Sequence, residues 1–175
     1  MKGLRSIPMI LKINRIENYK VSCLFSNGES RIIDFKSFFQ SKKNPITKTD
    51  LEYILINDIH EFNKIELIDK TIGWNNIGLV LKDFDGNEKF YPYQLDPIVL
   101  YEFSTKDEAE NLQIGKRMRE ERKKAGLSQE ELATKSGNSK HYISRLENDK
   151  SDIELLTLKK IIEAGLGKEM KINFE

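Results

Sequence analysis

Short runs of alternating apolar and polar residues fill the first hundred positions and predict β-strands. Residues 21–25 and 31–35 flank Asn27-Gly28, a strong signal for a tight hairpin, and Asp85-Gly86 predicts a second hairpin. The pattern therefore predicts a small antiparallel α+β domain over residues 1–103, with a sheet and a short helix. Its other expected elements are strands over 9–14 and 64–69 and a helix over 50–55 capped by Thr49.

From residue 104 onward the apolar spacing changes to that of amphipathic helices. Thr105 and Glu108 fit a capping box ahead of a helix that ends at Gly126, and a last helix is expected over 154–164. Residues 170–175 alternate apolar and polar positions again, which is the period of a strand. The sequence thus predicts an all-α domain over 104–175, with four helices and a C-terminal β-strand tail.

The most informative stretch, residues 127–148, predicts two short helices joined by a turn. Ser128 and Glu131 fit the Ser-x-x-Glu capping box of the first helix, and Ser139 can cap the second. Gly137 supplies the backbone freedom that a turn after a helix needs. Two helices on such a turn form a unit whose second helix can enter the major groove of DNA.

This stretch resembles the helix-turn-helix family of the lambda repressor and Cro, over residues 114–173. The resemblance is carried together by Gly-Leu-Ser-Gln-Glu-Glu-Leu-Ala at 126–133, Gly137, and Ile-Ser-Arg-Leu-Glu-Asn at 143–148. Either run alone would be weak, because many solvated helices contain similar strings. The resemblance implies a sequence-specific transcription regulator that binds double-stranded DNA, with a repressor acting as a homodimer on an inverted repeat as the leading interpretation.

In such a unit, residues at the start of the second helix face base edges. Lysine and arginine suit guanine, and a tyrosine ring can pack on a thymine methyl group. The candidate DNA-binding residues of this helix are Ser139, Lys140, His141, Tyr142, Ser144 and Arg145.

The resemblance also implies roles outside the base-contacting helix start. Gln129 is expected to bind a backbone phosphate, with Asn148 and Lys150 as similar candidates, and such contacts position the protein without selecting sequence. Arg122 and Glu147 match positions that form a partly buried structural ion pair in the family.

Glu121 and Ser136 occupy positions where the family commonly has apolar residues. They imply either a thinner core or a surface covered by another part of the chain, such as the N-terminal domain.

The alternating tail bears on assembly. In some repressors and antitoxins of the resembled family, a C-terminal strand pairs with its twin across a two-fold axis. We therefore expect a homodimer with Met170, Ile172 and Phe174 in or near the interface. Docking of the tail on the chain's own N-terminal sheet is the alternative.

The N-terminal half is similar to a family of small bacterial domains of unknown function. The matching positions include Tyr19-Lys20-Val21, Gly73-Trp74 and Asp96-Pro97, and the pattern departs between Trp74 and Asp96, where a hairpin is inserted. Because that family has no assigned chemistry, sensing a ligand, binding a partner and assisting dimerisation all stay open for this half.

Composition narrows the class of protein. The chain has 175 residues, 38% hydrophobic and 33% charged, which is typical of a soluble globular protein, and the cytoplasm is expected because no targeting or membrane segment is evident. The single cysteine, Cys23, agrees with a reducing compartment. No enzyme is expected, nor any metal or cofactor, since the only histidines, His60 and His141, lie in different domains.

Charge supports DNA binding only through its distribution. Residues 107–175 carry 14 Lys and Arg against 14 Asp and Glu, so this part is formally neutral. Six basic residues cluster between 116 and 124. Two alternatives therefore stay open: an antitoxin that also binds a toxin or another partner protein, and an interaction adaptor without DNA binding.

Overall fold

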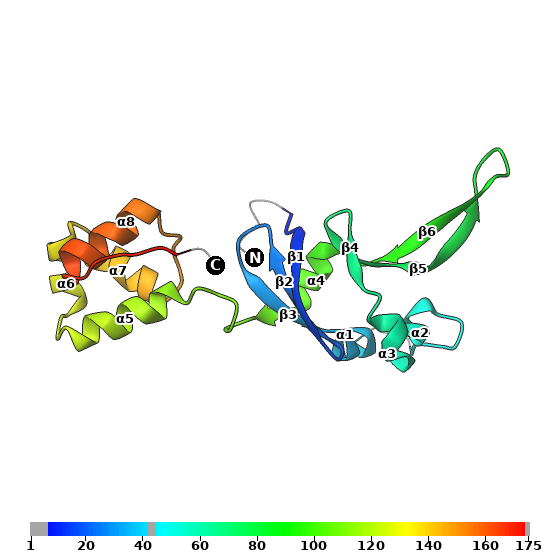
Figure 1. The fold of residues 1–175 in the computed structure, drawn as a ribbon, viewed down its shortest axis with the longest axis horizontal. Coiled ribbons are helices and arrows are strands. Elements are labelled where there is room, and N and C mark those ends of the chain that lie inside the picture. The colour runs from blue at the N-terminus through cyan, green and yellow to red at the C-terminus, as the bar shows by residue number, and fades with distance from the viewer. Residues whose placement is uncertain (1–6, 42–44, 174–175) are drawn as a thin grey trace. The chain divides into compact units, whose positions relative to one another are not determined.

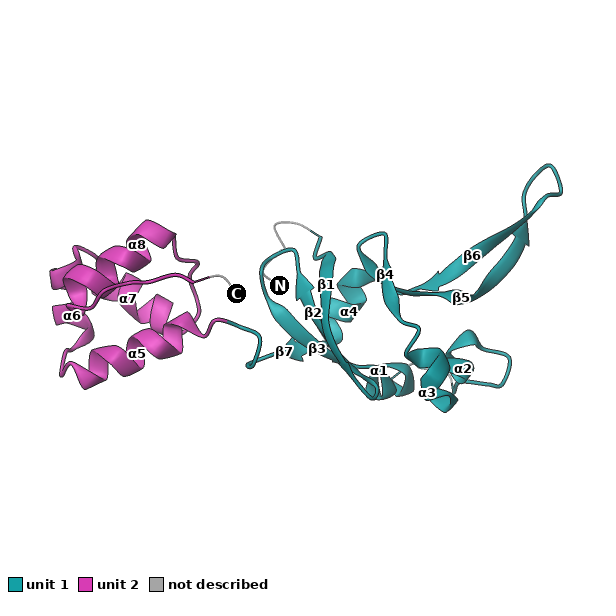
Figure 2. Cartoon of the chain, in the orientation of Figure 1, with its two compact units in different colours: residues 1–111 teal, residues 112–175 magenta. Residues whose placement is uncertain are grey.

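The computed structural model describes residues 7–41 and 45–173. The chain forms two compact units, residues 1–111 and 112–175 (Figure 2). The boundary follows Asn111, later than the position after residue 103 suggested by the sequence, because strand β7 (Thr105–Lys106) pairs with β3 (Ser30–Asp34) of the first unit.

The first sheet of unit 1 is antiparallel, in the order β1-β2-β3-β7 (Figure 2). It begins with β1 (Ile10–Glu17) and β2 (Lys20–Phe25). Strand β2 is followed by a tight turn at Gly28, which has a φ of 82°. Glycine adopts this left-handed backbone without a steric penalty, so the Asn27-Gly28 pair connects β2 to β3 as predicted.

The second sheet of unit 1 contains β4 (Glu66–Ile68), β5 (Thr71–Lys82) and β6 (Glu88–Gln94), all antiparallel. The β5–β6 hairpin turns at Gly86 as predicted, and the Asp83 carboxylate accepts hydrogen bonds from the backbone N–H groups of Asp85 and Asn87, each at 2.9 Å. Its outer part extends away from the rest of unit 1 (Figure 1).

Among its described residues, unit 1 also has four short helices, and aromatic side chains form much of its core. The rings of Phe35, Phe62 and Trp74 contact one another, and the Trp74 indole N–H donates to the Phe62 carbonyl at 2.8 Å. Phe35 was expected to end a strand, but Asp34 caps a helix there by accepting from the Ser37 N–H. The helices are α1 (Phe35–Gln40), α2 (Leu51–Asn57), α3 (Ile59–Phe62) and α4 (Pro97–Phe103).

A buried carboxylate fixes the end of unit 1. Asp107 is 1% exposed, accepts a hydrogen bond from Ser22 Oγ at 2.6 Å and pairs with Arg15 Nη1 at 2.8 Å. The expected capping box of Thr105 and Glu108 is wrong, because Thr105 lies in β7 and the next helix begins only at Ile114.

Unit 2 consists of helices packed around one apolar cluster, in agreement with the predicted all-α domain. Met118, Leu132, Ile143, Leu146 and Ile161 are buried together. Leu155, at the start of the last helix, is largely exposed. The helices are α5 (Ile114–Lys124), α6 (Gln129–Ser136), α7 (Lys140–Glu147) and α8 (Leu155–Lys160), which continues into the π-helical turn η1 (Ile161–Gly165).

The expected strand tail is not a strand within the described part of the chain. Residues 166–173 form no strand. Met170 is partly buried and Ile172 is half exposed, while Phe174 lies outside the described residues. A strand that forms only by pairing with a second copy has no partner in one chain, so the tail's role in a dimer stays a prediction.

We expect Asp107→Ala to destabilise unit 1 by about 2 kcal/mol, because Ser22 and Arg15 lose a charged hydrogen-bond partner. Urea unfolding followed by the fluorescence of Trp74, the only tryptophan, measures this. Glu17→Ala is the matched control: Glu17 also pairs with Arg15 but is exposed, so its loss should cost under about 1 kcal/mol. Equal effects of the two variants would contradict the assigned role of Asp107.

Candidate nucleic-acid interface

Backbone caps hold α6 and α7 at a fixed turn. Ser128 Oγ accepts from the Glu131 N–H at 3.1 Å while the Glu131 carboxylate accepts from the Ser128 N–H at 2.7 Å, which completes the predicted capping box. Gly137 ends α6 in left-handed geometry, with a φ of 61°, and Ser139 Oγ accepts from the Tyr142 N–H. These local interactions follow from the residue types at their positions, so the sequence alone predicted them.

Helix α7 has an inner and an outer face. Ile143 and Leu146 are buried in the cluster of unit 2. The opposite face carries Lys140, His141 and Arg145, all exposed, and the half-buried Ser144. Residues three and four apart share a face of a helix, so these polar side chains form one continuous outer surface.

Tyr142 differs from the other predicted base-contacting residues. Its side chain is half buried and packs against the apolar cluster of unit 2. Tyr142 therefore contributes to the packing of α7 on the cluster, unlike the exposed Lys140, His141 and Arg145.

Glu147, at the end of α7, is the centre of a buried polar network. Its side chain is 0% exposed, and its carboxylate accepts from Arg122 Nε at 2.5 Å, Arg122 Nη2 at 2.9 Å and Gln129 Nε2 at 2.8 Å. Arg122 Nη1 also donates to the Leu127 carbonyl at 2.7 Å. One carboxylate therefore links α5, α6 and α7, and the predicted Arg122–Glu147 pair is present in the structure.

The surroundings of Glu147 favour its ionised form. Burial alone would raise the pKa of the carboxyl group, but the hydrogen bonds from Arg122 and Gln129 outweigh burial and hold the pKa below its usual value. The two donors thus stabilise a buried negative charge at the C-terminal end of α7.

Arg119 belongs to the same network and was not singled out from the sequence. Its Nη2 donates to the Glu147 carbonyl at 2.7 Å and to Asn148 Oδ1 at 2.6 Å, so it satisfies acceptors at the C-terminal end of α7. Arg119 and Arg122 are three residues apart and so lie on the same face of α5. This spacing could have indicated that both bind the same residue.

The predicted phosphate-binding residues lie near one another but have partners within the chain. Gln129 donates to Glu147, and Asn148 donates to the Ser144 carbonyl at 2.7 Å. The Lys150 carbonyl accepts from Arg145 Nη2 at 2.9 Å. Internal bonds therefore orient Gln129, Asn148 and Arg145 before any ligand is present.

Two unusual polar positions are explained within unit 2 itself. Ser136 is buried, and its hydroxyl donates to the Leu132 carbonyl at 2.7 Å while accepting from Asn138 Nδ2 at 2.9 Å. Glu121 pairs with Lys124 and Lys168, whose ammonium groups lower its pKa to about 2. A cover from the N-terminal domain is thus not needed to explain either residue.

The cluster of basic residues on α5 divides into two groups. Arg119 and Arg122 point to Glu147, and Lys124 pairs with Glu121. Lys116, Arg117 and Lys123 are exposed. Lys124 is also exposed, so of the six basic residues only Arg122 is largely buried and most of the positive charge on this helix lies at the surface.

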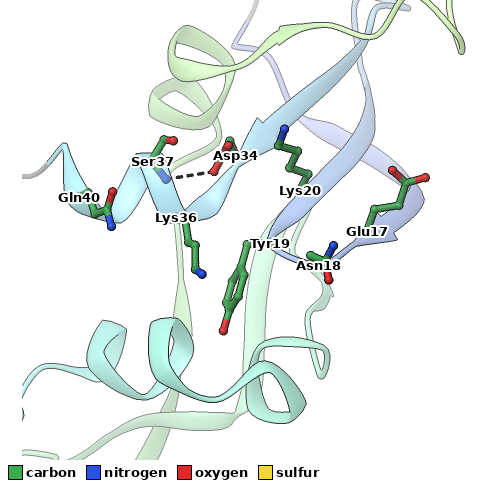
Figure 3. A pocket seen from close by; sticks show the side chains of 8 residues that line it. All are labelled: Glu17, Asn18, Tyr19, Lys20, Asp34, Lys36, Ser37 and Gln40. Atoms are coloured by element: carbon green, nitrogen blue, oxygen red, sulfur yellow. Dashed lines mark hydrogen bonds between the residues drawn. The ribbon is translucent and has the colours of Figure 1, made fainter.

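Unit 1 has a shallow polar pocket of about 750 Å³ (Figure 3). Lys36 Nζ lies 4.7 Å from the centre of the Tyr19 ring, and the Asp34 carboxylate is already used to cap α1. Carboxylates and ammonium groups share the pocket, so it has no marked preference for one sign of charge. Its lining residues are Glu17, Asn18, Tyr19, Lys20, Asp34, Lys36, Ser37 and Gln40.

No group of three or more His, Cys, Asp or Glu side chains is placed to hold a metal ion within residues 7–41 and 45–173. Cys23 is buried, and burial raises the pKa of its thiol to about 12. Over the same residues, none of the helices has the length and apolar character needed to cross a membrane.

Comparison with known proteins gives a family for part of the chain. Residues 118–165 match the helix-turn-helix family, which confirms the resemblance to the lambda-repressor and Cro type at the C-terminus. The match spans α5 from Met118 to the end of η1, and so includes the Glu147 network.

Two solved structures are similar to the chain. The wild-type restriction-modification controller protein C.Esp1396I is 28% identical over 33% of this chain and 74% of that chain, with a TM-score of 0.31. The putative DNA binding protein NE0471 from Nitrosomonas europaea ATCC 19718 is 14% identical over 89% of this chain and 84% of that chain, with a TM-score of 0.34. No curated protein matches.

We expect Glu147→Ala to destabilise unit 2 by about 3 kcal/mol at neutral pH, because it leaves Arg122 without its buried partner. The folded-state pKa of Glu147 is lowered, so its contribution is present above the unfolded pKa, about 4.3, and is lost as the pH falls through the folded value. The variant should therefore lose less stability than the native chain below about pH 4.3. Hydrogen exchange of α6 and α7 amides measures both effects.

Glu130→Ala is the control for this experiment. Glu130 pairs with Lys140 at 3.5 Å, but both side chains are exposed, so the change should cost under about 1 kcal/mol. Protection factors that fall equally in the two variants would overturn the assignment of Glu147 as the central residue.

Proposed function

We propose that this chain, whose residues 118–165 form a helix-turn-helix domain of the lambda-repressor and Cro type, is a DNA-binding transcription regulator. The observation that carries the proposal is the outer face of α7, where Lys140, His141, Ser144 and Arg145 are displayed from a helix whose other face is buried. A recognition helix needs this division, because one face must reach base edges while the other holds the helix in place.

The side chains of the outer face suit direct contact with bases. Lys140 and Arg145 can donate to guanine O6 and N7, and His141 and Ser144 can donate or accept. Lys140 forms only an exposed pair with Glu130, and Arg145 donates to one backbone carbonyl, so neither is committed to a buried structural role. We therefore assign sequence recognition to these residues.

Gln129, Asn148 and Lys150 are proposed to contact phosphates beside the groove. Gln129 stands at the first position of α6, where the free N–H groups of a helix start favour an anion. Its link to Glu147 connects the phosphate-binding end of α6 to the end of α7. A phosphate bound at α6 would thus set the register of the residues that contact bases.

We further propose that the protein acts as a repressor, by occupying promoter DNA as a homodimer on an inverted repeat. Two protomers related by a two-fold axis would contact half-sites about one helical turn, roughly 34 Å, apart. Such a regulator needs no chemistry of its own.

An adaptor without DNA binding is the second candidate. Residues 107–175 are formally neutral, and several basic side chains of α5 are engaged with carboxylates. An antitoxin that also binds a toxin is a variant of the regulator, with unit 1 as the partner-binding part.

We expect Lys140→Ala and Arg145→Ala each to reduce discrimination between the selected operator and random duplex by about 1–3 kcal/mol. Gln129→Ala should weaken all duplexes alike, because a phosphate contact carries no sequence information. Selection from a random DNA library followed by fluorescence anisotropy measures both. Absence of any preferred duplex for the native chain at low salt would favour the adaptor.

We expect removal of residues 169–175 to weaken the dimer if the tail with Met170, Ile172 and Phe174 exchanges strands between protomers. Light scattering of the full chain and the shortened chain measures the effect. An unchanged dimer would exclude strand exchange without affecting the proposal of DNA binding.

A further inference from the structure

The outer half of the β5–β6 hairpin carries apolar side chains that the other described residues leave largely exposed. Val80 is 58% exposed, and Leu79, Leu81, Phe90 and Tyr91 are each more than two-fifths exposed. These residues, with the fully exposed Phe84 at the tip, form the apolar ribbon over residues 78–91. A contiguous apolar patch of this kind marks an interaction surface.

Both faces of the apolar ribbon are hydrophobic. Leu79 pairs with Tyr91, and Val80 pairs with Phe90. Neighbouring pairs along a ribbon point to opposite faces, so each face carries an apolar pair. A two-stranded hairpin is marginally stable alone, and strands with apolar residues on both faces are typical of the interior of a larger sheet.

The two edges of the ribbon differ in what they offer to another strand. Strand β6 carries Pro92, which lacks an N–H to donate. Proline on an exposed edge hinders pairing with another strand. Strand β5 runs Gly-Leu-Val-Leu-Lys over 78–82 without proline. Within the described residues, β4 pairs only with Thr71–Gly73 of β5, and no backbone hydrogen bond from outside the hairpin reaches residues 78–82.

We propose that a second copy of this chain pairs with the edge of β5, antiparallel about a two-fold axis at Val80. The two ribbons then form one four-stranded sheet in the order β6-β5-β5-β6, in which each β5 is an inner strand. This inference rests on the proposed function only in that it names, for the proposed homodimer, a surface other than the C-terminal tail.

A second copy suits the edge because its own side chains complement it. With the axis at Val80, the two Val80 side chains are directly opposite, and Leu79 of each copy lies opposite Leu81 of the other. On one face, the row across the sheet is Phe90, Val80, then the second Val80 and the second Phe90. Lys82 falls opposite Gly78 and keeps its pair with Glu88, so no like charges face each other.

The composition of the ribbon also suits a second copy. It offers five large apolar residues in addition to Phe84. Edge pairing buries the backbone groups of β5 and the leucine and valine side chains beside them. A two-fold contact uses the same patch twice, so one hairpin supplies both halves of the interface.

Cross-linking tests the register directly. Val80→Cys in the full chain places two thiols at the axis, where directly opposite Cβ atoms lie about 4.5–5.5 Å apart, so a short bismaleimide should link two chains. The native Cys23 is buried, so the native chain should not be cross-linked. Phe84→Cys is the control, because the same register places the two thiols about 26 Å apart along the strands.

Val80→Lys tests the energetic side of the proposal. Two ammonium groups would meet at the axis, so sedimentation velocity should show a dimer dissociation constant raised at least tenfold, whereas Phe84→Lys should leave it unchanged. Trp74 fluorescence checks that both variants are folded. A monomeric native chain at micromolar concentration, a Val80→Lys variant that dimerises normally, or no cross-link at Val80→Cys would each overturn the proposal.

DNA binding is measured separately on one half-site and on the inverted repeat. If the ribbon is the dimer surface, Val80→Lys should bind one half-site with the affinity of the native chain. It should lose the increase in affinity that the native chain shows on the inverted repeat. Failure of the native chain to bind any duplex would count against the proposed function, while the cross-link and sedimentation results would still decide the interface.

Discussion

The buried Glu147 carboxylate holds the helix-turn-helix unit together. It receives hydrogen bonds from Arg122 on α5 and Gln129 on α6, while it is itself the last residue of α7. A buried charge is costly unless it is paired and hydrogen-bonded, and here the cost is offset by partners on both neighbouring helices. Together with Ile143 and Leu146 in the apolar cluster, this group fixes the orientation of α7 and hence of its outer face.

The same network connects stability to the proposed DNA contacts. Gln129, Asn148 and Arg145 are each oriented by a hydrogen bond within the chain. Side chains held in place before binding lose less conformational entropy on binding. Unit 2 thus combines a rigid helical frame with a polar surface that is largely preformed, and the near-neutral total charge of residues 107–175 conceals exposed lysines and arginines at particular positions.

Unit 1 shows a contrast between a well-packed body and an uncovered extension. Rings of Phe35, Phe62 and Trp74 fill the centre of the unit, whereas the apolar ribbon has hydrophobic residues on both faces and an open strand edge. The first arrangement is complete in one chain. The second suits assembly, because edge backbone groups and apolar side chains gain a partner only from another strand.

Local patterns were enough to predict much of this protein. The capping box at Ser128, the left-handed Gly137 and the Asn27-Gly28 hairpin follow from the preferences of a few adjacent residues. Contacts between distant residues were not predictable in this way: the segment around Asp107 joins unit 1 because Ser22 and Arg15 reach it.

The sequence by itself thus determined the helix-turn-helix and the division into an α+β part and a helical part. Only the tertiary structure decided that Tyr142 packs inward, that Arg119 serves Glu147 and Asn148, and that the apolar residues of β5 and β6 remain uncovered. The physical reason is how far apart along the chain the interacting residues lie. Caps and turns depend on neighbours in the chain, whereas burial depends on which distant segments come together.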